Sequence, residues 1–221
     1  MAKPIFGYWD VRGIAEPIRY LLRYKNVDFE DKQYLLSDPD SWFGTKFTYG
    51  LDFPNLPYYM DGSVKLTQST TILRYLAKKY NLEGETEEEK LRVSLLEQQI
   101  VDWRTSIIRL VYNENYEKLQ PDFVKGVPEQ LKRFEAFLGD RKFFAGEHLT
   151  YVDLMAFEII EYYRYMVNKV LDGFPVLREY RERMIELPGL KKYLESPEYR
   201  SWPLFAPHAQ WGGKGPEPKV D

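Results

Sequence analysis

The chain divides near residue 82 into two stretches in which the hydrophobic residues follow different periods. In the first stretch, glycine and proline separate short segments that alternate between strand-like and helix-like patterns. Strands are expected over residues 4–9, 27–35, 58–60 and 64–66, and helices over residues 15–24 and 68–80. This order restricts the first stretch to a small α/β domain.

The connections predict how these strands pair. The last two strands are joined tightly at Asp61 and Gly62, and Asp-Gly is typical of a tight β-hairpin. The first two strands are joined through a helix, which suits parallel neighbours. A polar loop is expected around Asp38, Pro39 and Asp40. The sequence therefore predicts a parallel pair followed by an antiparallel hairpin.

Almost everything after residue 90 has helical spacing. We expect a long helix near residues 91–111 and another that starts at Pro128, because proline is tolerated in a first turn. Thr150 and Asp153 stand just before an apolar run and resemble a capping box with Asp in place of Glu. Further helices are expected over residues 176–186 and 190–195, with an irregular tail from residue 203.

These patterns predict two domains, residues 1–82 and 91–221, with the linker between them at residues 83–90. The linker carries Glu85 and a run of three further glutamates, Glu87, Glu88 and Glu89. Acidic residues favour the N-terminus of a helix. We therefore interpret the run as the solvated start of a helix rather than as a site for a partner.

Composition excludes several kinds of chemistry. The chain has no cysteine and only two histidines, which lie far apart, so we expect no metal site, no cysteine nucleophile and no Ser-His-Asp triad. No glycine-rich phosphate loop is present. A net charge of -3 gives no basic excess for binding nucleic acid. Any thiol chemistry must therefore use the thiol of a ligand.

The N-terminal segment has no apolar core of a signal peptide, because Asp10, Arg12 and Glu16 follow closely. No apolar run approaches the ~20 residues that span a bilayer. We expect a cytoplasmic protein that does not enter a membrane. With 44% hydrophobic and 29% charged residues, the chain is typical of a globular protein.

Two pairs of residues are candidates for a binding site. Tyr8 and Trp9 must point to opposite faces of their strand, so one can pack in the core while the other faces a cleft. Gln68 and Ser69 open a helix, where backbone N–H groups can hold a small carboxylate. From the residues alone, core packing of the aromatic pair and simple helix capping by Gln68 and Ser69 are favoured.

Pro57 precedes a predicted strand. If its peptide bond is cis, the backbone N–H and C=O of Leu56 would face an extended peptide ligand.

The chain resembles a cytosolic glutathione transferase, mu-class-like and of the short-loop invertebrate type, over nearly its whole length. The matching segments are residues 7–13, residues 46–47, residues 50–59 and residues 66–69, with Asp102, Tyr112, Thr150, Asp153 and residues 202–204 in the second half. The segment over residues 50–59 is the most specific. The resemblance implies a thioredoxin-like α/β N-terminal domain followed by an all-α C-terminal domain.

The resemblance also implies roles for individual residues. Tyr8 would hydrogen-bond the sulfur of glutathione and favour the thiolate. Glutathione would be held by Trp9, Trp42, Lys46, Asn55, Leu56, Pro57, Gln68 and Ser69, and by Asp102 from the other subunit. The electrophile pocket would be lined by Ile14, Arg104, Tyr112 and Phe205. Phe53 resembles the aromatic residue that inserts into the partner of a homodimer.

Such a protein would conjugate glutathione, its co-substrate, to hydrophobic electrophiles, a detoxification reaction that needs no bound cofactor. Two departures stand out: the loop over residues 37–41 is shorter than in vertebrate mu proteins and has no arginine, and Thr70 and Thr71 replace an Asn-Ala pair. Alternatives on the same scaffold are a ligand carrier, a crystallin-like structural protein and a glutathione-dependent isomerase. The complete set of Tyr8, Trp9, Gln68, Ser69 and Asp102 favours an enzyme.

Overall fold

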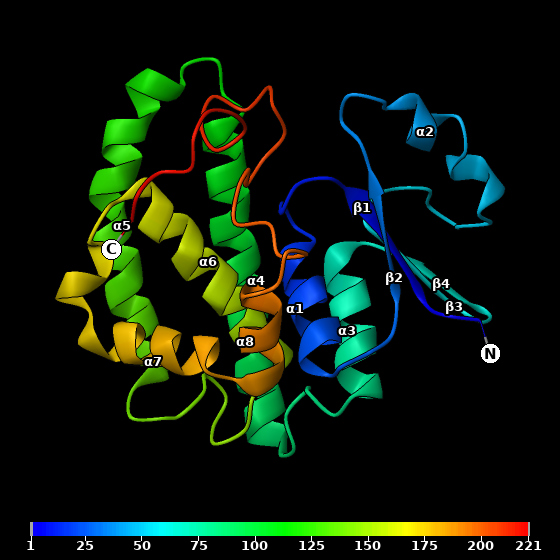
Figure 1. Cartoon of the computed structure of the whole chain (residues 1–221). Helices are drawn as coiled ribbons and strands as arrows, with labels where there is room; N and C mark the ends of the chain where they lie inside the picture. Colours follow the sequence, from blue (N-terminus) through cyan, green and yellow to red (C-terminus); the bar gives the residue numbers. More distant parts are fainter. Residues whose placement is uncertain (1, 221) are drawn as a thin grey trace.

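The structure of the protein is a computed structural model that describes residues 2–220. Met1 and Asp221, the end residues of the two expected domains, lie outside the described residues. Figure 1 shows a sheet with its helices on one side of the molecule and a larger bundle of helices on the other.

A four-stranded sheet forms the centre of the N-terminal part, with the strand order β2-β1-β3-β4 (Figure 1). Its strands are β1 (Ile5–Trp9), β2 (Glu30–Tyr34), β3 (Tyr58–Asp61) and β4 (Val64–Thr67). β1 pairs in parallel with β2 and antiparallel with β3, and β3 pairs antiparallel with β4. The predicted parallel pair and the predicted hairpin are confirmed.

Helices cover this sheet unequally. α1 (Glu16–Tyr24) and α3 (Ser69–Lys79) lie between the sheet and the helical bundle, whereas α2 (Asp40–Phe43) and the 3₁₀ helix η1 (Lys46–Thr48) lie on the other side (Figure 1). The short helix α2 occupies part of the expected polar loop. Pro39 stands at its N-cap with a φ of -66°, which suits the entry into a helix.

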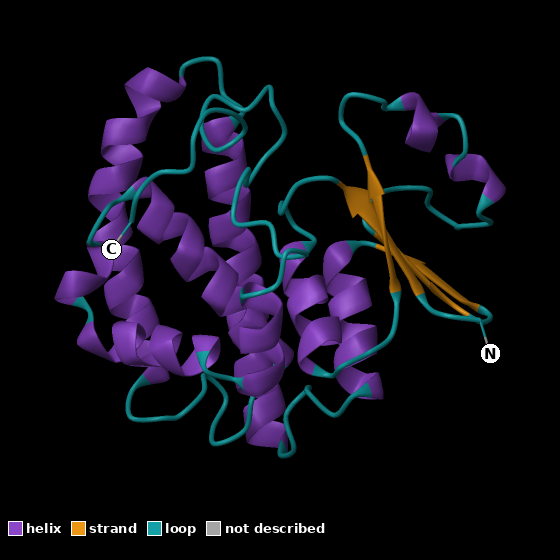
Figure 2. Cartoon of the chain, in the orientation of Figure 1, coloured by secondary structure: helices purple, strands orange, loops and turns teal. Residues whose placement is uncertain are grey.

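The C-terminal part is helical (Figure 2). It contains α4 (Glu87–Val111), α5 (Tyr116–Leu138), α6 (Tyr151–Met166), the 3₁₀ helix η2 (Val170–Gly173), α7 (Pro175–Ile185) and α8 (Pro188–Leu194). The predicted α/β and all-α organisation is confirmed. Nearly every residue of α6 is buried, so this helix forms the centre of the bundle.

Two helix starts follow the sequence signals. The capping box of Thr150 and Asp153 is present at the start of α6, as predicted. α4 begins at Glu87 after a second capping box, formed by Thr86 and Glu89. The acidic run therefore starts a helix, as interpreted from the sequence, and the last residues of the expected linker belong to its first turn.

The expectation that a helix starts at Pro128 is wrong. Pro128 and Pro121 both lie inside α5, which begins at Tyr116. An interior proline lacks the N–H of the helical ladder and costs about 3 kcal/mol or more. The helix continues because Leu131, Phe134 and Leu138, in the turns after Pro128, are buried and offset this cost.

Polar side chains fix the loop after β1 to the helical bundle. The side chain of Arg12 is 0% exposed and forms an ion pair with Glu158 on α6. The Tyr162 hydroxyl, also on α6, donates a hydrogen bond to the carbonyl oxygen of Gly13 at 2.7 Å. The backbone N–H of Gly13 donates to the carbonyl oxygen of Leu204 at 2.8 Å. This loop is thus held from the bundle and from the C-terminal segment.

Candidate active site

Tyr8 lies near the end of β1, and its side chain is 8% exposed. Its hydroxyl oxygen accepts a hydrogen bond from the backbone N–H of Ile14 at 3.4 Å. Gly13 stands in the left-handed region at a φ of +49°, and a Cβ at this position would lie 2.5 Å from the Tyr8 hydroxyl. A glycine is therefore needed for the loop to pass this close to the tyrosine.

Burial raises the pKa of the Tyr8 hydroxyl above its usual value, although the Ile14 N–H and the charges of Arg19 and Arg104 lower it in part. The hydroxyl therefore keeps its proton at neutral pH. A protonated phenol can donate a hydrogen bond to an anion, and such a bond to a charged acceptor contributes about 1.5–3 kcal/mol. Tyr8 is thus suited to stabilise an anionic atom rather than to remove a proton as a phenolate.

A cavity of about 470 Å³ opens beside Tyr8. Most of its wall is apolar, and it lies where the loop after β1, helix α4 and the C-terminal segment meet. Among the predicted electrophile-pocket residues, Ile14, Tyr112 and Phe205 line it. Its other lining residues are Tyr8, Trp9, Val11, Gly13, Leu36, Pro39, Phe43, Ile108, Ala206 and His208. Such a cavity suits a hydrophobic ligand placed next to the hydroxyl.

Arg104 does not line this cavity, although it acts electrostatically on Tyr8. Arg104 lies on α4, one helical turn before Ile108 and two before Tyr112, the C-cap residue of the helix. Sequence reasoning missed Ile108, which the four-residue spacing between Arg104 and Tyr112 could have indicated. Sequence reasoning also gave His208 no place in a site, whereas the His208 ring lies 5.0 Å from the Tyr112 ring at the cavity.

The predicted glutathione-binding aromatic residues lie on the α2 side of Tyr8. Trp9 lies 6.0 Å from Phe43 between ring centroids. Trp42 on α2 is buried among tyrosine rings. The ammonium group of Lys46 lies over the rings of Phe43 and Phe47. These side chains form one edge of the region that surrounds the end of β1.

The peptide bond between Leu56 and Pro57, in the loop before β3, is cis, which is the condition under which the Leu56 backbone was expected to face a ligand. A second cis bond, between Trp202 and Pro203, was not predicted. The N–H of Leu56 donates a hydrogen bond to Asn55 Oδ1 at 2.9 Å. The N–H that was expected to face a ligand is therefore already bonded to the Asn55 side chain.

The N-terminus of α3 presents open hydrogen-bond donors. Gln68, at its N-cap, has a φ of +71° and is exposed, while Ser69 is buried. The Gln68 side chain makes no capping hydrogen bond to the helix. A residue other than glycine at positive φ is uncommon and marks functional sites more often than chance. An uncapped helix start of this kind suits a carboxylate.

Asp102 lies apart from these residues. It is exposed on α4, where it accepts a hydrogen bond from Gln98 at 3.3 Å, and it does not line the cavity beside Tyr8. Phe53 is also exposed, in the loop between η1 and β3. Within one chain, the structure thus brings Trp9, Ile14, Tyr112 and Phe205 to the cavity beside Tyr8, whereas Asp102 and Phe53 are exposed away from it.

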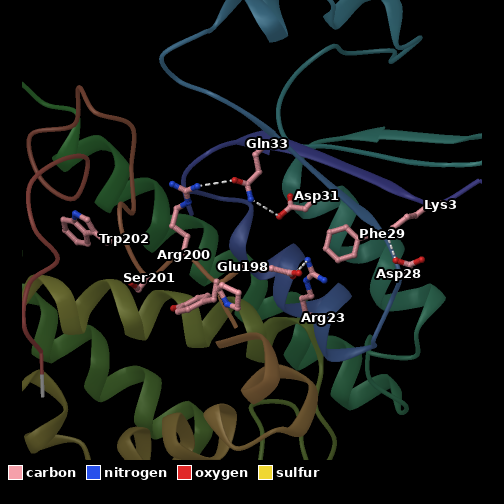
Figure 3. Close-up of a pocket in the computed structure, with 12 residues that line it drawn as sticks. Lys3, Arg23, Asp28, Phe29, Asp31, Gln33, Glu198, Arg200, Ser201 and Trp202 are labelled. Atoms are coloured by element: carbon pink, nitrogen blue, oxygen red, sulfur yellow. Dashed lines mark hydrogen bonds and ion pairs between the residues drawn. The ribbon is translucent and has the colours of Figure 1, made fainter. Parts of the chain in front are cut away.

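A larger hollow, of about 700 Å³, lies between β2 and residues 197–202 (Figure 3). Its charges are largely paired: Arg23 with Glu198, and Lys3 with Asp28. Arg200 donates to Gln33 at 3.2 Å. This hollow shares no lining residue with the cavity beside Tyr8. Within residues 2–220, no three potential metal-binding side chains cluster in it or elsewhere.

The structure thus joins a sheet that carries a cis-proline loop to a helical bundle, with an apolar cavity at the junction. The family model described as "Glutathione S-transferase, N-terminal domain" matches residues 4–78, and "Glutathione S-transferase, C-terminal domain" matches residues 101–197. The chain belongs to the glutathione S-transferase family.

Comparison with individual relatives indicates which class of this family the chain resembles. It is 46% identical to "Glutathione S-transferase Mu 1" of Mus musculus over 95% of this chain and 99% of that protein. It is also 46% identical to a "Glutathione S-transferase" of Tyrophagus putrescentiae, over 96% and 98%. The crystal structure of the glutathione S-transferase Blo t 8 matches with a TM-score of 0.89 at 38% identity, over 94% of this chain and 99% of that one. The chain is mu-class-like.

These relatives favour the transferase over the ligand carrier, the crystallin-like protein and the isomerase. No helix within residues 2–220 is both long and apolar enough to cross a bilayer.

Proposed function

We propose that this chain conjugates the thiolate of reduced glutathione to hydrophobic electrophiles, with Tyr8 as the residue that stabilises the thiolate. The observation that carries the proposal is the protonated Tyr8 hydroxyl at the wall of an apolar cavity. The uncapped start of α3, with Gln68 and Ser69, would hold the γ-glutamyl carboxylate of glutathione.

The remaining contacts to glutathione follow from the same placement. Leu56 would pair with the cysteinyl backbone once the Asn55 side chain turns away from its N–H. Trp42, Lys46 and Trp9 would hold the glycine end and the backbone of the tripeptide. Ile14, Tyr112 and Phe205 would contact the electrophile, and Arg104 would act on it at longer range.

The physical chemistry of one hydrogen bond is sufficient for this role. A free thiol has a pKa near ~8.5, and lowering it by about two units requires roughly 2.7 kcal/mol. The hydrogen bond from Tyr8 would supply about 1.5–3 kcal/mol. The thiolate then attacks an electrophilic carbon that the cavity holds in position, and proximity lowers the barrier further.

Replacing Tyr8 with phenylalanine is expected to lower kcat/KM for a chloronitrobenzene by roughly ten- to one-hundredfold, because the bond to the thiolate is lost. The ultraviolet absorbance of the bound thiolate, followed against pH, should show the pKa of the bound thiol rising toward ~8.5.

Tyr75→Phe is the matched control, since Tyr75 lies on α3 outside the site and should keep the wild-type rate. A full rate in Tyr8→Phe would remove Tyr8 from its role. Wild-type protein that binds glutathione but conjugates nothing would contradict the transferase and favour an isomerase or a carrier. A rate assay on an isomerisable substrate would distinguish these two.

We also propose a homodimer in which Phe53 of one protomer enters an apolar cavity between α4 and α5 of the other. Phe53 is 74% exposed. The receiving cavity has a volume of about 170 Å³ and is lined by Leu95, Leu96, Gln99, Trp103, Arg133, Phe134 and Phe137. Leu91 and Leu95, also exposed on α4, would be covered by the same contact. The dimer would bring Asp102 to the glutathione of the other subunit.

Phe53→Ala is expected to weaken the dimer by roughly 30- to 1,000-fold in Kd, since a central aromatic anchor contributes about 2–4 kcal/mol. Sedimentation velocity over a dilution series measures this change. Phe47→Ala is the control, because Phe47 is equally exposed but lies on η1. Unchanged association of Phe53→Ala would contradict this role of Phe53.

The finer organisation is proposed on the same basis. Residues 1–82 would form the thioredoxin-like glutathione-binding domain and residues 91–221 the all-helical domain, with residues 83–90 between them. The enzyme would act in the cytoplasm, bind no nucleic acid and no membrane, and use glutathione as co-substrate with no bound cofactor or metal.

A further inference from the structure

A network of tyrosine hydroxyls lies on the α2 side of the sheet, outside the residues assigned to the reaction. The Tyr49 hydroxyl oxygen accepts a hydrogen bond from Lys32 Nζ at 2.9 Å and another from the Tyr34 hydroxyl at 3.0 Å. The Tyr34 and Tyr58 hydroxyl oxygens lie 2.9 Å apart. Three tyrosines and one lysine, from β2, β3 and the segment after η1, thus share one hydrogen-bond network.

The direction of these bonds is fixed because each hydroxyl carries one proton. Since Tyr34 donates to Tyr49, Tyr58 must donate to Tyr34. Tyr49 in turn donates to Thr45 Oγ1 at 3.5 Å, and Thr45 Oγ1 donates to the carbonyl oxygen of Ser41 at 2.7 Å. The network therefore runs from the sheet to the backbone of α2.

The same tyrosines enclose Trp42. The Trp42 ring stacks on Tyr49 at 6.1 Å with an interplanar angle of 11°, and on Tyr58 at 5.8 Å with an angle of 18°. Tyr34 meets it edge-on at 5.3 Å. Trp42 is 2% exposed, yet its indole N–H donates to no described residue and is not among the buried unpartnered atoms. The N–H is therefore the part of Trp42 that remains open to a ligand.

We propose that Tyr49 is a positioning residue of the glutathione site, held by Lys32 and Tyr34 so that its ring keeps the Trp42 N–H directed toward the tripeptide. This inference rests on the proposed function, because Trp42 is one of its proposed glutathione contacts. Tyr49 itself contacts neither glutathione nor the electrophile, so it acts on binding and not on the chemical step.

The charges around the Tyr49 hydroxyl give the network a spectroscopic signature. Burial by itself would raise the pKa of Tyr49, but the hydrogen bonds that its hydroxyl oxygen accepts from Lys32 and Tyr34 more than offset this and lower the pKa to about 8. Tyr58, in contrast, has its pKa raised to about 12, chiefly by burial. The other charged group nearby, Lys65 on β4, donates to the carbonyl oxygen of Tyr49 at 2.7 Å. One tyrosine should therefore titrate well before the rest.

The test uses Tyr49→Phe, which keeps the ring, and Lys32→Met, which keeps the aliphatic stem. Phenolate absorbance against pH should show one tyrosine titrating near pH 8 in wild type, none there in Tyr49→Phe, and a shift toward ~10 in Lys32→Met. Calorimetry should show glutathione binding weakened about three- to tenfold in both variants. KM for glutathione should rise by the same factor while kcat stays within about twofold.

Tyr75→Phe is again the control and should change neither readout. Unchanged glutathione affinity in Tyr49→Phe would overturn the proposal, as would a loss of kcat with no change in KM. Wild-type protein that binds glutathione without conjugating it would contradict only the proposed function. Calorimetry would still measure the effect of the Tyr49 and Lys32 substitutions on glutathione affinity. Wild-type protein that binds no glutathione would overturn both.

Discussion

Replacing Glu158 with alanine is expected to lower the free energy of unfolding by about 3–5 kcal/mol. Its carboxylate on α6 accepts from Arg12 Nε at 3.2 Å and Nη2 at 2.5 Å, and from the Tyr20 hydroxyl at 2.8 Å. The Arg12 side chain is fully buried. Without Glu158, the buried Arg12 guanidinium would lose the carboxylate that pairs with it directly, and removing one partner of a buried ion pair is strongly destabilising.

Urea denaturation at fixed protein concentration measures the change. Glu129→Ala is the matched control: Glu129 pairs with Arg133 at 3.4 Å, and both side chains are largely exposed, so its loss should cost less than about 1 kcal/mol. A double variant, Arg12→Met with Glu158→Leu, should recover most of the lost stability because no charge is left buried. A Glu158→Ala protein as stable as wild type would show that solvent reaches Arg12 and would contradict this account.

Local patterns in the sequence were sufficient for much of the fold. The Asp61-Gly62 turn predicted the hairpin, and the three-residue spacing of Thr150 and Asp153 predicted the start of α6. These features depend on residues a few positions apart, so a single sequence contains the needed information. Pro128 shows the limit of such reasoning. A proline is tolerated at this position inside α5 because apolar residues of the helix pack against other helices. A local sequence pattern contains no information about such packing.

The site was only partly predictable for the same reason. Residues alone favoured core packing for Tyr8, and Tyr8 is in fact nearly buried as well as at the cavity wall. Its proposed role came from the resemblance of whole segments, above all residues 50–59. The network of Tyr49, Lys32 and Tyr58 joins residues far apart in sequence, and so does the pair of Arg12 and Glu158. No spacing rule predicts such contacts.

Asp153→Asn is expected to destabilise the protein by about 3 kcal/mol or more at pH 7. The side chain is fully buried, and its Oδ2 accepts hydrogen bonds from the Thr150 N–H and Thr150 Oγ1, each at 2.8 Å. Oδ1 accepts from the Phe144 N–H at 2.8 Å. An amide NH₂ in place of one oxygen would face these donors and leave them unpaired, at about 1–3 kcal/mol for each.

For a chain of this length, a loss of about 3 kcal/mol lowers Tm by roughly 6–12 °C. Differential scanning calorimetry of Asp153→Asn and of Thr150→Ala measures the Tm of each variant and so compares what the carboxylate and the hydroxyl contribute to stability. Thr150→Ala removes the hydroxyl donor but leaves the carboxylate, so it should cost only about 0.5–2 kcal/mol. Equal losses in the two variants would mean that the carboxylate adds nothing beyond the cap.

The pH dependence gives Asp153 a second, independent test. Burial raises the pKa of this carboxyl from 3.8 to about 6, although its hydrogen bonds with Phe144, Thr150 and Tyr180 lower it in part. Between these values the folded chain holds a proton that the unfolded chain has released, so this group favours folding less as the pH rises. The amide side chain of the Asp153→Asn variant has no such proton. Urea denaturation should therefore show the stability gap between wild type and Asp153→Asn narrowing by up to about 3 kcal/mol from pH 4 to pH 7. A gap that widens over this range would mean that the hydrogen bonds outweigh burial and hold the pKa below that of the unfolded chain.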